Sequence, residues 1–516
     1  MRFTVITILA FLIIRLEAQN SVSFFHLGNT TFQNTYLNPS LIPEGKTFIG
    51  LPLLSGIHVH FNSKLSYNEV FTKENDEILV DVYGKILPNL QRNNLFSAHV
   101  NVNLFHLGIK TKKGMLIGFM ANERVEADAV YSRDLVDFFW NGNDQFLNRD
   151  IKPSDAGIKG THFREIGLSL AAPINERLTL GAKGKFLVGF LDISTPGNFN
   201  ARLNSSGEAF QVDAEWKNYA IRTSGFDIYD GNEGSLSSHL VMNSNNGLAL
   251  DLGATYRLHR NYTITGSILD IGYIRWKEDI YTEALNDTTF RYDGVQLDNL
   301  GTIVQTVQDS LLDRFVTTEN NDPYTSWLPV KVYGSWIYHY SQKTDIHLTT
   351  GSRIIQRQAK MLYGLGITHR FGKVFTASVS ATKLPQQFIN LGAAFALKGG
   401  PIQMYLAADQ MVNYSVPDMR LFDFRFGINF IFEKKDAKGN GRGGYYNKPF
   451  KARAKGYDTN IFLGKKVKTK KREGIYSIIK RQKRRELKDK KTKQRKISNK
   501  SLNGFQGKKN LNNELH

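Results

Sequence analysis

The chain has 516 residues, a net charge of +20 and no cysteine, so it can form one large barrel or several ordinary domains. The lack of cysteine excludes a lipid-modified cysteine and argues against a disulfide-built extracellular module. The charge is uneven: residues 433–516 contain 28 Lys and Arg but 7 Asp and Glu, a net charge of +21, so residues 1–432 are nearly neutral. Outside the N-terminus no apolar run reaches roughly 18 residues, which argues against helical membrane spans.

Residues 1–18 have the pattern of a secretory signal peptide. Arg2 supplies a positive charge, a short apolar stretch follows it, and Ala18 suits the position before cleavage. The apolar stretch is too short for the alternative, a membrane anchor. We therefore predict export and a mature chain that starts near Gln19.

Residues 19–46 form an extension before the first predicted strand, which begins at Thr47. Pro39 and Pro43 interrupt this extension, and proline lacks a backbone donor, so the extension is not the interior of a strand. Two alternatives remain open. The extension plugs the lumen of a barrel, or it is a simple leader into the first strand.

Residues 47–432 repeatedly alternate apolar and polar residues, which is typical of β-strands with one apolar face. Examples are residues 98–104, 262–268 and 375–382, and in the last two the polar positions are all Thr or Ser. Small hydroxylic residues suit a polar interior. We count about 14 such strands.

The final strand, Phe424 to Phe432, gives the clearest signal. Four phenylalanines and one isoleucine share one face, while arginine, glycine and asparagine share the other. A soluble protein would need a deep core for the aromatic face, whereas a transmembrane barrel turns that face to lipid.

The connections between the predicted strands alternate in length. Tight turns are predicted at residues 111–114, 173–177, 259–261 and 341–344, and long stretches at residues 132–162, 194–246 and 277–326. Outer-membrane barrels have short periplasmic turns and long external loops. Within the first long stretch, Arg133 to Leu147 predicts an amphipathic helix, either a lid or part of a packed loop.

These features predict an all-β fold, a transmembrane antiparallel β-barrel of about 14 strands in the cell outer membrane. The barrel spans residues 47–432, with an N-terminal extension and a mostly disordered basic C-terminal tail. The strands of a soluble β-sandwich also alternate apolar and polar residues, but the signal peptide, the aromatic final strand and the loop lengths favour the barrel. We expect the barrel to be monomeric and surrounded by outer-membrane lipid.

Residues 433–516 form the lysine-rich tail, and an even number of strands would place it in the periplasm. At about 1 kcal/mol per Lys or Arg near an anionic surface, a few contacts would tether it to lipid, peptidoglycan or an acidic periplasmic protein. The alternative is a disordered, merely solvated tail. We expect no nucleic-acid partner. The candidate contact residues are Lys480, Arg481, Lys483, Arg484 and Arg485.

Few residues suggest chemistry. His58 and His60 lie two apart on a predicted strand, so both could reach one metal ion. No third ligand is identifiable and a polar lumen explains the pair, so we predict no metal site. The glycine spacing at residues 439–444 matches a dinucleotide loop but lacks the βαβ unit, so we predict no cofactor. Since no nucleophile elbow, zinc-protease or Walker motif occurs, we predict no enzyme activity.

Several segments resemble a poorly characterised family of outer-membrane barrels from Bacteroidota. They are Leu37 to Gly45, Phe48 to Pro52, Phe138 to Asn143, Glu165 to Ser169, Leu269 to Gly272 and Ile274 to Trp276. At superfamily level they are similar to fatty-acid-transporter-like barrels and to barrels associated with type IX secretion and gliding. The resemblance implies the fold and the outer membrane, and it does not cover the tail.

Two functions remain open from the sequence. The first is a non-catalytic scaffold or accessory component of a secretion, motility or surface complex, whose tail docks a periplasmic partner. The alternative is a passive transporter of a hydrophobic or small solute, gated by the N-terminal extension or by the helix in residues 132–162. The tail favours the scaffold, because a conduit has no need of it.

Overall fold

The computed structural model describes residues 22–433, except for residues 75–76, 142–145, 152–155, 197–199, 207–210, 227–242, 286–287, 293–316, 356–357, 385, 388 and 411–414. The chain divides into two units, residues 1–450 and 451–516. The second unit lies outside the described residues. The signal peptide and the tail residues Lys480, Arg481, Lys483, Arg484 and Arg485 lie outside them too.

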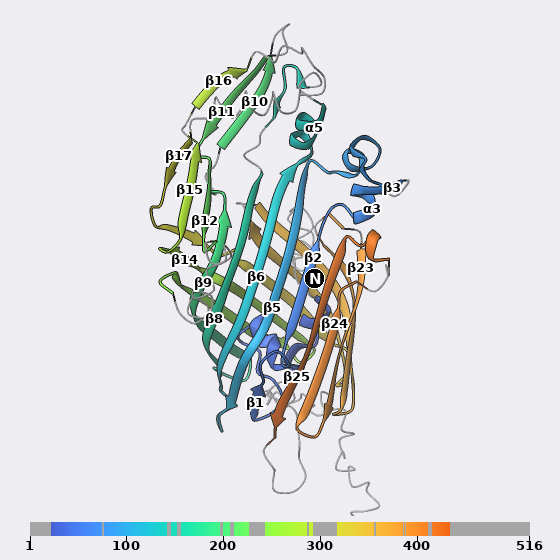
Figure 1. Ribbon diagram of the computed structural model, residues 1–516. Helices are drawn as coiled ribbons and strands as arrows, with labels where there is room; N and C mark the ends of the chain where they lie inside the picture. Colours follow the sequence, from blue (N-terminus) through green and yellow to red (C-terminus); the bar gives the residue numbers. More distant parts are fainter. Residues whose placement is uncertain are drawn as a thin grey trace, which may run out of the picture. The chain divides into compact units, whose positions relative to one another are not determined.

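One antiparallel sheet closes on itself into a barrel (Figure 1). The last strand, β25, pairs with both β1 and β2. These two short strands follow one another along the same strand position of the wall, between β25 and β5. The described wall is therefore a closed 14-strand barrel, which confirms the predicted fold class. The wall strands are β1 (Thr47–Gly50), β2 (Ile57–Asn62), β5 (Asn93–Lys110), β6 (Leu116–Ser132), β8 (Gly157–Pro173), β9 (Leu178–Ser194), β13 (Asn246–His259), β14 (Tyr262–Trp276), β19 (Lys331–His339), β20 (Thr344–Ile355), β21 (Gln358–Phe371), β22 (Phe375–Lys383), β23 (Ile389–Gly399), β24 (Ile402–Ala408) and β25 (Leu421–Phe432).

The long connections contain strands that the sequence pattern did not resolve. Four of these strands extend the wall, four others form a separate sheet, and two form a hairpin. Figure 1 shows the separate sheet beyond the end of the barrel that is opposite the short turns. The strands are β12 (Ala220–Ser224), β15 (Ile280–Leu285), β17 (Thr317–Asn320) and β18 (Tyr324–Trp327); β7 (Asp150–Ile151), β10 (Asn200–Ser206), β11 (Gln211–Lys217) and β16 (Thr288–Tyr292); and β3 (Phe71–Glu74) with β4 (Glu77–Val80).

The helices are short. The predicted amphipathic helix begins at Arg133 as expected, but α5 ends at Asn141, and Phe146 packs beside Phe138 with ring centroids 6.2 Å apart. Among the described residues no helix is long and apolar enough to cross a membrane. The helical elements are α2 (Val22–Phe25), η1 (Gly28–Thr30), η2 (Phe32–Tyr36), α3 (Tyr67–Val70), η3 (Val82–Ile86), α4 (Leu87–Asn89), α5 (Arg133–Asn141) and η8 (Val416–Asp418).

The outer face of the wall is apolar and the inner face is polar. On β8, Leu168 is 66% exposed on the outside, whereas Glu165 points inward and is 3% exposed. On β25, Phe432 is 46% exposed and Asn429 is fully buried. An apolar outer face around a polar lumen is the arrangement of an outer-membrane barrel.

Candidate functional site

Residues 22–46, called here the N-terminal segment, lie inside the barrel. At the end of β24, Asp409 accepts the backbone N–H groups of Val22 at 2.5 Å and Ser23 at 3.0 Å, and it also accepts the Ser23 hydroxyl. On β21, Thr368 donates to the carbonyl of His26 at 2.9 Å. Backbone groups that lose water need new partners, and the wall side chains provide them. The segment therefore fills part of the lumen rather than leading directly into β1.

The turn at Asn38 to Ser40 contacts the opposite part of the wall. The Asn38 amide donates to Thr265 Oγ1 at 2.5 Å, and Ser40 Oγ lies 2.8 Å from Thr255 Oγ1. These two threonines lie on β14 and β13, while Asp409 follows β24. The segment is thus fixed at both sides of the lumen by hydrogen bonds between small polar groups.

Apolar side chains of the N-terminal segment pack against small wall residues. Phe24 lies 5.1 Å from the ring of Tyr405, and both belong to one buried cluster with wall alanines. The His26 ring stacks on His347 at 4.6 Å. Burial lowers the pKa of His26 well below its usual range, and His347 acts in the same direction, so His26 is neutral. The cluster contains Phe24, Phe25, Leu27, Leu37, Leu41, Ala394, Ala396, Tyr405 and Ala407.

Ten buried charged side chains form a second feature of the described lumen, called here the lumen charge network. It contains five cations and five carboxylates, so its formal charge balances. No member has a side chain more than 11% exposed, and buried charges of this kind are tolerated only when paired. The members are Arg124, Lys183, Lys185, Lys331 and Arg353 with Glu126, Asp128, Glu165, Asp251 and Asp270.

Arg124 is the central cation of the network. Its guanidinium lies 2.5 Å from Glu126, 2.7 Å from Glu165 and 2.8 Å from Asp270. Asp270 belongs to β14, which is separated from the β6 strand of Arg124 by β8, β9 and β13. The guanidinium of Arg353, on β20, also lies 2.7 Å from the carboxylate of Glu126. These ion pairs cross the lumen and join distant parts of the wall.

A β-bulge directs Asp270 into the network. The register between β13 and β14 shifts at this point, so that Leu269 and Asp270 together face Asp251. Asp270 has a φ of 61°, in the left-handed region that Asp tolerates better than most residues, and its N–H donates to Asp251 at 2.8 Å. The bulge allows the neighbouring side chains of Leu269 and Asp270 both to be buried.

A polar cavity of about 80 Å³ lies between the N-terminal segment and the lumen charge network. Gln33 and Tyr36 line it from the segment, and Arg124 and Asp270 line it from the network. About 10–15 Å³ of such volume is enough for one water molecule. The cavity can therefore hold several waters or a small polar solute.

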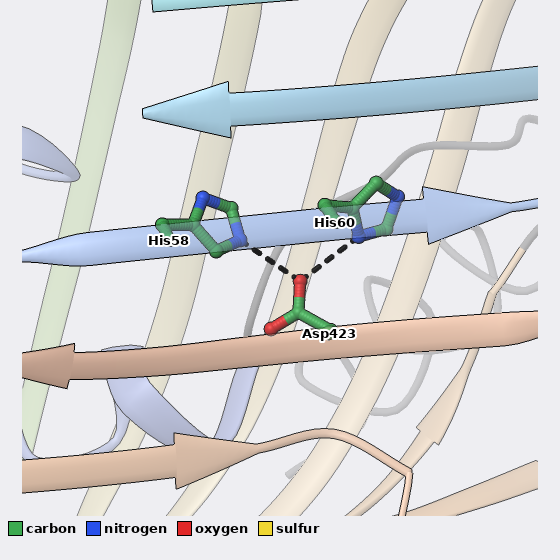
Figure 2. Close-up of side chains that lie close together, drawn as sticks. All are labelled: His58, His60 and Asp423. Atoms are coloured by element: carbon green, nitrogen blue, oxygen red, sulfur yellow. Dashed lines mark hydrogen bonds and ion pairs between the residues drawn. The ribbon is translucent and has the colours of Figure 1, made fainter. Parts of the chain in front are cut away.

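His58 and His60 lie on β2 and point into the lumen, as their spacing predicts. Asp423 of β25 lies opposite His60 in the strand register. Figure 2 shows both imidazoles directed at one carboxylate oxygen, with His58 Nε2 at 3.0 Å and His60 Nδ1 at 2.9 Å from Asp423 Oδ2. The structure thus supplies the third group that was not identifiable from the sequence.

The lumen charge network was also missed from the sequence, where we expected a lumen of mostly small hydroxylic residues. A signal was present. Arg124, Glu126 and Asp128 recur at every second position of one strand, as do Lys183 and Lys185. Charges at successive inward positions of a barrel strand must find partners across the lumen. The predicted tail contacts lie outside the described residues, so they stay predictions.

Comparison with solved structures finds similarity only at very low identity and low TM-score. The Ralstonia pickettii toluene transporter TbuX and a Pseudomonas aeruginosa FadL homologue are each 10% identical, with a TM-score of 0.38, covering 81% of this chain and 100% of theirs. The P. putida toluene transporter TodX is 10% identical, with a TM-score of 0.33 and the same coverage. No curated protein matches the chain.

One family model matches residues 39–409, from the turn of the N-terminal segment to the end of β24. Its description is "Family of unknown function (DUF5723)". This confirms the resemblance to a family without an assigned activity, while the origin in Bacteroidota and the link with secretion stay predictions. The chain belongs to the DUF5723 family of unknown function.

Proposed function

We propose that this protein is a gated, passive transporter of a small polar solute across the outer membrane, with the N-terminal segment as the gate. The observation that carries the proposal is the way the segment is held. Residues 22–45 contact the wall through side-chain hydrogen bonds, such as Ser40 to Thr255, and through apolar packing, and none of them belongs to a strand of the described sheet. Each such bond contributes about 0.5–1.5 kcal/mol, and none of them is part of the strand pairing of the wall, so displacement of residues 22–45 leaves that pairing intact.

The cavity supports a polar rather than an apolar solute. Its lining includes Arg124, Glu165 and Asp270, and a hydrocarbon would desolvate these charges without replacing their water. Because the positive and negative charges of the network balance, it favours neither a cationic nor an anionic solute. A small, neutral, hydrogen-bonding solute best matches this lining.

Liposome swelling tests the proposal. Vesicles that contain the full-length chain should admit small polar solutes faster than protein-free vesicles, with a rate that falls steeply with solute size. The proposal fails if entry equals that of protein-free vesicles for every solute, both in the native chain and in a folded variant whose segment is displaced from the wall.

Deletion of residues 433–516 separates transport from the scaffold hypothesis. The deletion starts after the last wall strand, so we expect the truncated barrel to fold and to admit solute at the native rate. A mild-detergent pull-down of both forms from outer membranes, with mass spectrometry, provides the second readout. Loss of a stoichiometric periplasmic partner on truncation, together with no solute entry in either form, would instead establish the scaffold.

A further inference from the structure

His58, His60 and Asp423 bring three potential metal ligands together in the lumen. Their ligating atoms all lie within 4.8 Å of one another. They come from two neighbouring strands whose register places His60 opposite Asp423, so the wall itself fixes their spacing. His60 and Asp423 are buried, and the side chain of His58 is 12% exposed.

The positions of these atoms are close to what a metal ion requires. Zinc binds histidine nitrogen and carboxylate oxygen at about 2.0–2.2 Å, which places neighbouring tetrahedral ligands roughly 3.3–3.4 Å apart. The two nitrogens now lie 3.0 and 2.9 Å from Asp423 Oδ2, so small rotations of the side chains would admit an ion. The His60 ring also stacks on the ring of His99, with ring centroids 5.4 Å apart, and this contact helps to fix its orientation.

The surroundings leave room for a fourth ligand. Of the three groups, His58 lines the polar cavity, which is large enough to hold water. Three protein ligands with one open position are typical of exchangeable or reactive zinc sites rather than closed structural ones. The backbone of Asp423 is held in turn, since its carbonyl accepts the N–H of Asp409 at 3.3 Å.

We propose that His58, His60 and Asp423 bind one divalent transition-metal ion, with zinc the best match to two imidazoles and a carboxylate, and with the fourth position open to the lumen cavity. The site depends on the strand register alone, so it does not rest on the proposed transport function. On binding, each neutral imidazole carries its proton on the other ring nitrogen, Nδ1 of His58 and Nε2 of His60, so that His58 Nε2 and His60 Nδ1 present lone pairs to the ion, and their hydrogen bonds to Asp423 are replaced by bonds to the metal.

Cobalt titration of the full chain in detergent, after chelator treatment, tests the site. We expect one Co²⁺ per chain with the visible absorption of a tetrahedral ion, displaced by Zn²⁺. Asp423→Asn and His60→Gln should each weaken binding on the order of 100-fold or more, since loss of even an outer-shell partner costs 10–100-fold. His369→Gln is the control, because His369 bonds Thr344 outside the cluster and should leave binding unchanged.

Variants that lose the heat-modifiable gel mobility of a folded barrel are set aside. X-ray absorption at the zinc edge of the native chain then provides a readout that needs no variant, with two imidazole ligands expected. Binding that is absent, or equally strong in folded Asp423→Asn and His369→Gln, would overturn the proposal. A zinc spectrum without imidazole ligands would overturn it too.

Discussion

Replacing Arg124 by methionine is expected to lower the free energy of unfolding by about 3–5 kcal/mol, the usual cost of removing one partner from a buried ion pair. Arg124 lies within 2.8 Å of Glu126, Glu165 and Asp270, and its removal leaves these carboxylates short of one cation. Methionine keeps much of the side-chain volume, so the change isolates the charge. Denaturant unfolding in detergent, monitored by tryptophan fluorescence, measures the difference in the free energy of unfolding between the variant and the native chain.

Arg149→Met is the matched control for this variant. Arg149 pairs with Asp134 at 2.6 Å, but its side chain is 53% exposed, in the connection between α5 and β7. Partly exposed ion pairs of this kind contribute about 0–1 kcal/mol. If both variants lost the same small amount of stability, the lumen charge network would be well hydrated, and it would not be a buried bridge across the lumen.

Gly181→Val is expected to displace the N-terminal segment and to increase solute entry severalfold. Gly181 lies on the inner face of β9, and a Cβ at this position would collide with the backbone of Pro39 and Ser40. Backbone cannot rotate away as a side chain can, so the turn must leave the wall. The overpacking should also cost about 1–3 kcal/mol of stability. Liposome swelling with small polar solutes measures the effect on entry.

Gly184→Val tests whether this effect is specific to the segment. Gly184 lies on the same strand, and a Cβ there would meet no heavy atom within 4 Å. The control should therefore keep the native rate of solute entry. It reduces the flexibility of the strand by the same glycine-to-valine change as Gly181→Val. Equal entry in folded Gly181→Val and Gly184→Val would show that the segment does not limit passage.

The barrel could be predicted from the sequence because its signal is local. Alternation along one strand decides which residues face lipid, as in Phe424 to Phe432, and the number of such strands sets the barrel size. The same reasoning placed His58 and His60 on one inner face. Alternation did not reveal the strands in residues 194–246 and 277–326, because these strands are short and pair with distant partners.

The lumen contacts could not be predicted because they depend on which strands face each other across the barrel. Arg124 and Asp270 are 146 residues apart, and their contact requires both the closure of the wall and a bulge at Asp270. Asp423 became the third member of the histidine cluster only through the pairing of the first and last parts of the wall. The position of the N-terminal segment likewise rests on individual hydrogen bonds and apolar contacts with the wall that no periodic pattern encodes.

The chain has no cysteine, so a disulfide can be introduced without competing thiols. Ser40 Oγ and Thr255 Oγ1 lie 2.8 Å apart, one on the N-terminal segment and the other on β13. The double variant Ser40→Cys, Thr255→Cys can therefore join the segment to the wall by a bond of about 2.0 Å between the sulfurs. Thr344→Cys, His369→Cys is the matched control, because it joins two directly opposite residues of adjacent wall strands, whose side chains lie 2.9 Å apart.

The most direct test measures solute entry into liposomes for both double variants, first oxidised and then reduced. If the N-terminal segment is the gate, the oxidised Ser40–Thr255 variant admits no solute and reduction restores entry to the native rate, while the control pair admits solute in both states. Undiminished entry in the oxidised Ser40–Thr255 variant, with the disulfide confirmed by mass spectrometry, would contradict a gating role for the segment.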